Sequence, residues 1–485
     1  MNMTAFDPND FLVILPEIFL LAATFVLLLV DLFLKPGQRG VTHWLALLIL
    51  AVTAALVWRD APAAGQGWTA FGGMFQRDAV ATVLKLFIVL LSGLTFVYGR
   101  EYLRERNLLV GEFYLLVMFA TLGMLLLVSA GNLVMVYLGL ELLTLSSYAL
   151  VALHRDSKES SEAAIKYFVL GALASGLLLY GMSMIYGATG TLDLSRIHAA
   201  VDTVQHPNLL AVGLVFLVVG VAFKLGAAPF HMWLPDVYQG APTAVTLFIG
   251  SAPKLAAFGM AWRLLDGGLG GLAPHWTQML AFLIVLSLAV GNIFAIAQTN
   301  LKRLLAYSTI SHIGFLLLGF VGATSDGYAA ALFYAVSYAI TAAVAFGMIL
   351  LLARAGFEAG DIEDFKGLNR RNPWYAGIMA IVMFSLAGVP PLFGFFAKLM
   401  VLKAAIDAGQ LWLAIVAIVF AIIGLYYYLR VVKVMYFDEP ADPAPLLLPR
   451  DLPMRWALSV NGLALLALGL TWGPLFDWCR RSFGA

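Results

Sequence analysis

Long apolar stretches separated by short polar connectors fill almost the whole chain. A helix needs roughly 20 apolar residues to cross a bilayer, and on this rule the sequence predicts about fourteen membrane-spanning helices. We therefore expect an all-α polytopic membrane protein. The predicted spans lie near residues 11–34, 41–58, 79–98, 113–129, 132–153, 161–187, 209–235, 242–264, 276–298, 303–322, 327–353, 374–404, 411–436 and 456–475.

Two of these stretches are interrupted by a proline that follows a run of small residues, which indicates an internal repeat. Pro229 follows the small-residue run LGAA, and Pro390 follows LAGV. A proline removes a helical hydrogen bond, and paired interrupted spans are typical of transporters whose functional site lies at the breaks. We expect one integral membrane domain. It would contain N-terminal helices (about 1–110), a first repeat (about 111–265), a second repeat (about 275–437), and a Pro-rich connector with a C-terminal helix (438–485).

Lysine and arginine are distributed unevenly between the two sides of the predicted spans. Cytoplasmic loops carry an excess of these residues. We therefore predict that both termini lie on the periplasmic side of a bacterial inner membrane. The predicted inner loops hold Lys35, Arg39, Arg100, Arg104, Arg106, Arg155, Lys158, Lys302, Arg303, Arg354, Lys366, Arg370, Arg371, Arg450 and Arg455, against Arg59, Arg77, Arg196, Arg480 and Arg481 outside.

Composition supports the membrane class and excludes several kinds of site. The 485 residues are 62% hydrophobic and only 12% charged, too few charges to cover the surface of a soluble protein. A net charge of +1 without a basic tract argues against a nucleic-acid partner. The single cysteine, Cys479, excludes a disulfide framework and an iron–sulfur cluster built from this chain alone. No nucleotide-binding or hydrolytic motif is present, so we expect no cofactor or metal on this chain.

Four ionisable residues lie inside predicted spans: Glu141, Lys224, Lys254 and Lys398. A charge in hydrocarbon costs at least a few kcal/mol and usually faces a wet protein interior where it has a function. Burial disfavours the charged form of such a group, and an opposite charge nearby favours it. A Glu141–Lys224 pair whose separation changes would therefore bind and release a proton. The residues predict a path for protons or ions through the bilayer.

Each of these residues also has a structural interpretation. A neutral Glu141 would hydrogen-bond a hydroxyl such as that of Thr144 or Ser146. Pro253 marks either a break or a helix start, and in the second case Lys254 would be a side chain that snorkels from a helix end. Lys398 has the same alternative. Glu17, Asp31 and Lys85, in the early spans, are interpreted as local anchors or partner contacts.

Three further residues are secondary relay candidates: Lys166, His231 and His312. Glu162 precedes Lys166 by four residues, so the two predict either a helical ion pair or a lysine that modulates Glu141. His231 lies just past the first break and would either cap broken backbone or carry protons. His312 is open between core packing and a relay.

Several segments around these residues resemble one known family. LGLELLTLSSYALVAL, EAAIKYFVLGALASG and GVAFKLGAAPFHMWLPDVYQGAPT are similar to segments of the antiporter-like membrane subunits of respiratory complex I. SAPKLAAF, AQTNLKRLLAYSTISHIGFLLLG and FSLAGVPPLFGFFAKLMVL extend the resemblance over nearly the whole chain. Lys398, where the M type typically has glutamate, and the run GLYYYLRVVKVMYF favour the N type among the three.

The resemblance implies fourteen helices with two inverted five-helix repeats, each containing a broken helix. It implies that Glu141 and Lys224 are a coupling pair, that Lys254 connects the sites and that Lys398 lies nearest the exit. FMN, iron–sulfur clusters and quinone are then expected on partner subunits, and neighbouring antiporter-like subunits and lipid are expected as contacts. The implied function is proton translocation driven by electron transfer from NADH to quinone. A cation/proton antiporter subunit, a hydrogenase-type complex and a purely structural subunit remain as alternatives.

Overall fold

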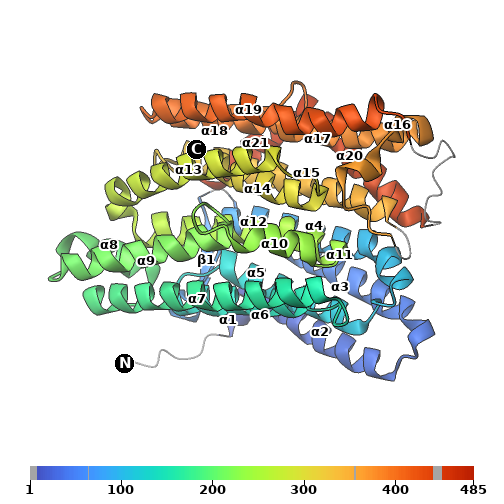
Figure 1. The fold of residues 1–485 in the computed structure, drawn as a ribbon. Coiled ribbons are helices and arrows are strands. Elements are labelled where there is room, and N and C mark those ends of the chain that lie inside the picture. The colour runs from blue at the N-terminus through green and yellow to red at the C-terminus, as the bar shows by residue number, and fades with distance from the viewer. Residues whose placement is uncertain (1–7, 64, 354–356, 441–450) are drawn as a thin grey trace.

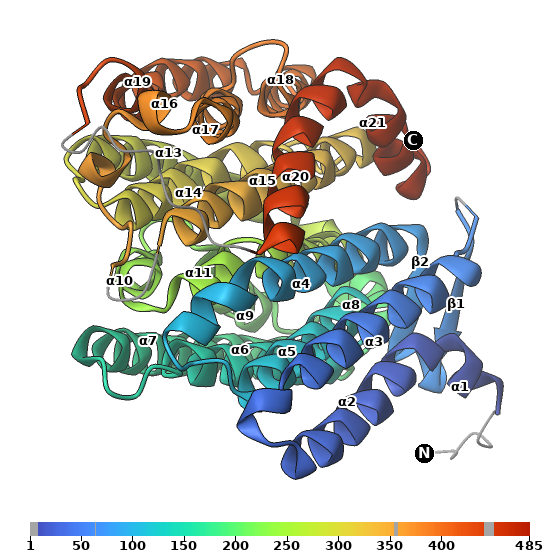
Figure 2. The ribbon, with the colours of Figure 1, turned by 90° about the vertical axis from the view of Figure 1, so that its right-hand side faces the viewer.

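The computed structural model describes residues 8–63, 65–353, 357–440 and 451–485. Arg354, Arg450 and residues 441–450 of the predicted connector lie outside this part of the chain. The described residues form a bundle of long helices that run side by side in stacked rows (Figure 1). Figure 2 shows that α15 lies in the middle of this bundle, between the N-terminal helices and α17–α19.

Within the described residues, twelve helices are long and apolar enough to cross a membrane. The predicted all-α membrane class is confirmed, and with the less apolar α14 and the broken unit α17–α18 the count agrees with about fourteen crossings. The unbroken crossings are α2 (Leu15–Phe33), α3 (Gly40–Arg59), α4 (Ala79–Glu105), α5 (Gly111–Val128), α6 (Leu133–Val151), α7 (Lys158–Thr189), α13 (Ala273–Ile296), α14 (Leu301–Leu318), α15 (Ser325–Leu352), α19 (Leu411–Tyr436) and α20 (Leu452–Leu470).

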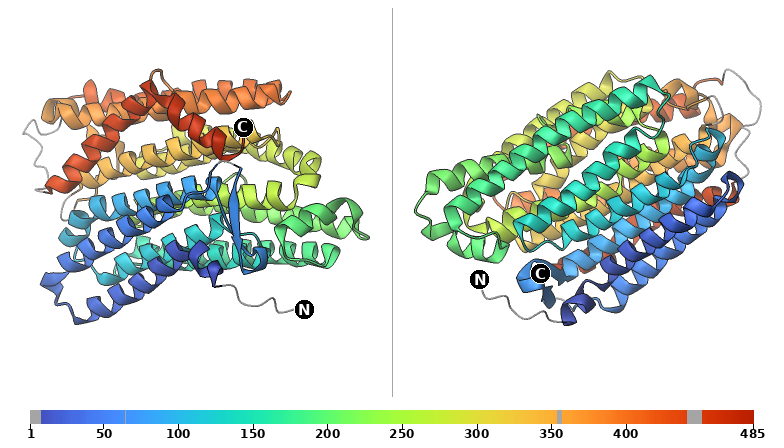
Figure 3. Two further views of the ribbon diagram at one scale, coloured as in Figure 1. Left: turned by 180° about the vertical axis from the view of Figure 1, so that it is seen from behind. Right: turned by 90° about the horizontal axis from the view of Figure 1, so that it is seen from below.

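One end of the bundle carries a small β-hairpin that the sequence did not predict. Strands β1 (Gly67–Ala70) and β2 (Phe75–Asp78) pair antiparallel, with Gly67 opposite Asp78. The N–H of Gln76 donates to Ser129 O at 2.7 Å, which fixes the hairpin to the end of α5. Short helices α1 (Asn9–Val13), α8 (Leu194–Ala200) and α21 (Trp472–Ser482) lie at this hairpin end (Figures 2 and 3). We call the opposite end, where α4 ends and α11 and α14 begin, the basic end.

Both predicted breaks are present, but each helix ends at a glycine rather than at the proline. The predicted span 209–235 consists of α9 (Pro207–Leu225) and α10 (Trp233–Gly240), and 374–404 consists of α17 (Pro373–Ala387) and α18 (Phe393–Asp407). Gly226 and Gly388 follow α9 and α17 with φ values of 90° and 86°. These left-handed angles suit glycine and close a Schellman-type turn, so the chain has left the helix before it reaches the proline.

The predicted span 242–264 is also divided. It consists of α11 (Thr243–Gly250) and α12 (Ala252–Trp262), with non-helical Ser251 between them. A six-residue π-helical turn, Arg263–Gly268, continues α12. Pro253 occupies the first turn of α12, where its missing N–H leaves no helical bond unmade. The proline therefore marks a helix start.

The two repeats share a turn that lies at opposite ends of the bundle. In the first repeat, Leu133 N–H donates to Leu192 O at 2.9 Å, and Asn132 pairs with Asp193. In the second, Leu301 N–H donates to Gly360 O at 2.7 Å, and Asn300 pairs with Asp361. The first turn contacts the hairpin end, and the second lies at the basic end. The same local structure with reversed direction is what an inverted repeat requires.

A buried ion pair fixes the N-terminal helices to the rest of the bundle. Lys85 Nζ of α4 lies 2.6 Å from Glu17 Oε1 of α2, and each side chain is only 2% exposed. The ammonium also lies 4.7 Å from the ring centre of Phe75. The interpretation of Lys85 and Glu17 as local anchors agrees with this contact. Asp31 accepts a hydrogen bond from Thr42 Oγ1 at 2.6 Å.

Removing one partner of this pair should destabilise the protein more than removing both. Glu17→Gln or Lys85→Met alone leaves an uncompensated buried charge, which typically costs about 3–5 kcal/mol. The double variant leaves none and should recover most of that loss. The thermal midpoint of the detergent-solubilised protein is the measurement. Single variants that melt with the parent protein would show that the pair contributes no net stability.

Candidate functional site

Lys224 lies in the last turn of α9, just before the first break. Its side chain faces a void of about 10 Å³, the size of one water molecule. Thr144 and Tyr148 of α6, Tyr167 of α7 and Trp233 of α10 line the same void. Within the described part of the chain, the Lys224 ammonium makes no hydrogen bond and no ion pair. A buried lysine without a partner is costly, so this position is unlike an ordinary structural lysine.

Glu141 lies halfway along α6 and is half-buried. Thr144 Oγ1 lies 3.5 Å from Glu141 Oε2 and bonds Leu140 O more closely, at 2.8 Å. The charges of Glu141 and Lys224 interact, but no ion pair within 4 Å joins them among the described residues. The structure thus places the two predicted partners near each other and unpaired, with a mainly apolar void that includes a few hydroxyl groups beside the lysine.

Lys254 is buried against the end of the broken helix. Its ammonium donates to Leu225 O, the last residue of α9, at 3.0 Å, and lies 5.2 Å from the ring centre of Trp233. The side chain is 1% exposed, so the alternative of snorkelling to solvent is wrong even though α12 begins beside Pro253. Trp233 Nε1 donates to Phe223 O at 3.0 Å and so satisfies a second carbonyl of the same helix end.

Lys398 makes the corresponding contact at the second break. Its ammonium donates to Leu386 O and Ala387 O, at 2.9 Å each, where α17 ends. It also lies 4.9 Å from the ring centre of Phe315. A cation at a helix C-terminus is favoured by the partial negative charge of the unpaired carbonyls. Lys398 is therefore directed into the break and does not snorkel.

His312 of α14 lies beside the second break, in a cluster of hydroxyl groups. Its Nδ1 is 2.6 Å from Tyr334 Oη and its Nε2 is 3.1 Å from Tyr428 Oη. A second void of about 10 Å³ is lined by His312, Tyr334 and Leu386. The carbonyl of Leu386 is the one that Lys398 binds. These tyrosines were not among the residues predicted from the sequence, although hydroxyls in an apolar span such as residues 327–353 are a signal that they have polar partners.

The other two relay candidates occupy different surroundings. Lys166 forms the predicted ion pair with Glu162 at 2.8 Å and a second one with Asp236, also at 2.8 Å. Arg303 binds the same Asp236 at 2.7 Å, beside a surface pocket of about 400 Å³ at the basic end. The ammonium of Lys166 is therefore paired with two carboxylates. His231 lies in the segment between α9 and α10 and is half-buried.

The predicted residues thus form two groups. Glu141, Lys224 and Lys254 gather at the first break, and His312 and Lys398 at the second. Among the described residues, no hydrogen bond or ion pair joins Lys254 directly to His312. Cys479 is buried in α21, and the described residues contain no cluster of three or more potential metal ligands.

Residues 130–424 match the family model described as NADH:quinone oxidoreductase/Mrp antiporter, TM. NADH-quinone oxidoreductase subunit N of Xanthomonas euvesicatoria pv. vesicatoria is 58% identical over 474 residues, which cover 98% of this chain and 96% of that protein. The same subunit of Herminiimonas arsenicoxydans is 55% identical over 483 residues, 97% of each chain.

A chain in the structure of respiratory complex I from Thermus thermophilus with bound aureothin is 34% identical, with a TM-score of 0.81 over 95% of this chain and 98% of that one. A chain of the archaeal membrane-bound sulfane sulfur reductase has a TM-score of 0.84 over 97% of this chain and 96% of that one; at 24% identity it shows the shared fold alone. The chain therefore belongs to the NADH:quinone oxidoreductase/Mrp antiporter family of membrane subunits, and within it to the group of subunit N.

Proposed function

We propose that this chain translocates protons as the N subunit of a bacterial NADH–quinone oxidoreductase. The observation that carries the proposal is the pair of broken helices, each with a buried lysine at its end and a void the size of one water molecule. A void of this size with hydroxyl groups in its lining has room for one water molecule, through which a proton can pass. Electron transfer from NADH to quinone on partner subunits would supply the driving force.

In the first repeat, Lys224 is the residue whose charge changes. It is buried without a partner, so its ammonium is stable only while a carboxylate is close. Movement that brings Glu141 and Lys224 together loads the lysine, and movement apart releases the proton to the void. Lys254 follows, because it binds the carbonyl of Leu225, the residue next to Lys224.

In the second repeat, Lys398 receives and releases the proton, with His312 as the relay beside it. A void with room for about one water molecule is lined by His312 and by Leu386, whose carbonyl Lys398 binds. His312 is held by two tyrosine hydroxyls, which fix the ring and extend the polar path. His231 remains a weaker candidate at the first break.

The proposed function also implies an orientation in the membrane and partner subunits that carry the cofactors. The excess of arginine and lysine at the basic end supports an orientation with that end in the cytoplasm and both termini on the periplasmic side of the inner membrane. FMN, iron–sulfur clusters and quinone belong to partner subunits. The one cysteine lies buried in α21 and is unsuited to hold a cluster by itself.

The alternative functions predict different observations. A purely structural subunit would hold its charges in static pairs, which suits Lys166 but not the unpaired Lys224. A cation/proton antiporter subunit would show sodium-dependent transport without redox activity. A hydrogenase-type complex is distinguished by the subunits that co-purify with the chain. Relatives more than 50% identical are named as subunit N, which favours the first proposal.

Loss of the ammonium at position 224 should uncouple pumping from electron transfer. We expect Lys224→Ala to slow proton translocation by more than about tenfold, because the variant lacks the group that binds the proton. NADH oxidation with an artificial acceptor should change little. The measurement is protons pumped per NADH by the complete complex in proteoliposomes, with Lys224→Arg as the charge-retaining control. Normal pumping by Lys224→Ala would refute the assignment.

Lys398 and Lys403 provide a matched comparison on one helix. Lys403 also belongs to α18, but its side chain is 69% exposed and pairs with Asp407 at 3.2 Å. Lys398→Met removes two hydrogen bonds to the end of α17 and the titratable group, so the pumping ratio should fall by about tenfold or more. Lys403→Met should pump as the parent does. Equal ratios for the two variants, in complexes with a full set of subunits, would argue against a role for Lys398.

A further inference from the structure

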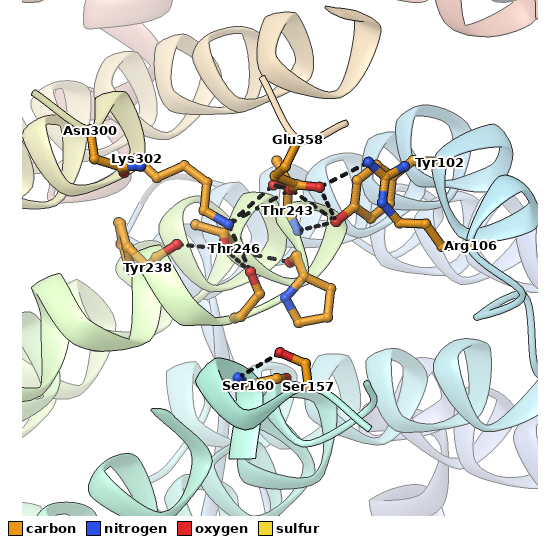
Figure 4. Close-up of polar contacts among 12 residues, drawn as sticks. Tyr102, Arg106, Ser157, Ser160, Tyr238, Thr243, Thr246, Asn300, Lys302 and Glu358 are labelled. Carbon is orange, nitrogen blue, oxygen red and sulfur yellow. Dashed lines mark hydrogen bonds and ion pairs between the residues drawn. The ribbon is translucent and has the colours of Figure 1, made fainter. Parts of the chain in front are cut away.

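A further buried lysine lies at the junction between the two repeats, at a position that the sequence predicted to lie in an inner loop. Lys302 belongs to the first turn of α14 at the basic end, and its side chain is 5% exposed. Its ammonium donates to Ala241 O at 2.9 Å, just past the end of α10, and to Thr243 Oγ1 at 3.2 Å. Figure 4 shows these contacts between elements of both repeats.

Glu358 brings a carboxylate from the surface to the same place. It lies in the connection after α15, and its side chain is 37% exposed. Tyr102 Oη of α4 lies 3.0 Å from both carboxylate oxygens, and Arg106 Nη2 donates at 2.9 Å. The hydroxyl of Thr243 donates to Glu358 Oε1, and Lys302 Nζ lies 3.8 Å from the same oxygen (Figure 4).

Thr243 therefore bridges a buried ammonium and a water-accessible carboxylate. Its single hydroxyl accepts a hydrogen bond from Lys302 and donates one to Glu358. A hydroxyl can do both at once because it has one proton and two lone pairs. The proton donor, the hydroxyl and the proton acceptor therefore form one continuous chain of hydrogen bonds.

We propose that Glu358, Thr243 and Lys302 form a proton-transfer station between water at the basic end and the second repeat. When Lys302 gives up a proton to Thr243 Oγ1, the hydroxyl proton passes to the carboxylate, which leaves a neutral amine and a carboxylic acid. Rotation of the hydroxyl and the reverse transfer return the proton from Glu358 to Lys302. No electrons move, and the proton comes from water or returns to it. The inference rests on the proposed function, because it supplies protons to the same pathway.

The face of α14 shows where the proton goes next. Thr309 and His312 lie seven and ten residues after Lys302, at spacings that share one helix face. The distance along the axis from Lys302 to His312 is roughly 15 Å. Thr309 Oγ1 lies 2.7 Å from Tyr338 Oη, and the ring of that tyrosine lies 5.0 Å from the ring of His312. Hydroxyl groups therefore follow the face of α14 toward the second break.

A purely structural tie would not need this arrangement. Arg106 and Tyr102 together hold the connection after α15 onto the end of α4, and both are compatible with an exposed carboxylate. Placing the Lys302 ammonium in the interior adds a desolvation cost of several kcal/mol that a tie does not require. The added cost is expected where a charge has to exchange protons.

Two threonines of α11 allow a matched test. Thr246 lies three residues after Thr243 and is equally buried, but its hydroxyl donates only to backbone carbonyls such as Tyr238 O, at 3.1 Å. Thr243→Val removes the bridging hydroxyl at constant size, and Thr243→Ser keeps it. Thr246→Val removes a hydroxyl that bridges nothing. Each variant is measured in the complete complex, as protons pumped per NADH in proteoliposomes.

We expect Thr243→Val to lower the pumping ratio by at least about tenfold, because loss of a positioned proton-transfer group typically costs about a hundredfold or more. Thr243→Ser and Thr246→Val should match the parent. Glu358→Gln keeps the side-chain shape but does not take up a proton, so its pumping ratio should be lowered as that of Thr243→Val is. This second variant decides the matter if Thr243→Val fails to assemble.

The possible outcomes separate the two proposals. If Lys224→Ala loses pumping while Thr243→Val or Glu358→Gln pumps at the parent ratio, the station is wrong and the proposed function stands. If Thr243→Ser is as poor as Thr243→Val, the methyl packing and not the hydroxyl is responsible, and the station is wrong. If Lys224→Ala itself pumps normally, the proposed function fails.

Discussion

Helix ends inside the bundle leave carbonyl groups that need donors, and buried lysines supply them. Lys254 binds the end of α9, Lys398 the end of α17, and Lys302 the carbonyl just past α10. In hydrocarbon an unsatisfied carbonyl costs several kcal/mol, so these ammonium groups are part of the fold. A neutral amine still has two N–H donors. Lys398 makes two carbonyl bonds and so can lose its proton without leaving either carbonyl unpaired, which reconciles a structural contact with a proton-carrying one.

Lys224 is the exception, and the comparison between repeats explains why. Counting from the capping residues Asn132 and Asn300, Glu141 corresponds to Thr309. Counting back from Gly226 and Gly388, Lys224 corresponds to Leu386. The first repeat thus has an acid and an unpaired lysine where the second has a hydroxyl and an apolar side chain. The two breaks share a backbone design, and the proposed coupling pair belongs to the first.

The sequence predicts the parts of this protein that depend on local composition. Span length and the cost of a charge in hydrocarbon identified the helices and the lysines, and small-residue runs with prolines located both breaks. Contacts between segments that lie far apart in the sequence could not be predicted from local composition. Lys254 binds a carbonyl 29 residues earlier, and Glu358 meets Thr243 across 115 residues. The hairpin β1–β2 was missed because two four-residue strands at a helix end carry no long apolar pattern.

The junction at Lys302 joins residues from both repeats. Thr243 opens the last unit of the first repeat, Lys302 opens the second helix of the second repeat, and Glu358 follows the third. A change in the charge of Glu358 or Lys302 alters contacts to α4, α10 and α11 at once, because their partners come from all three. Protonation at this point would therefore act on the helix packing between the repeats as well as on the proposed proton path. Coupling of this kind needs an element that both sites influence, and α11, which carries Thr243 between Lys302 and Glu358, is the element on which the proposed station would act.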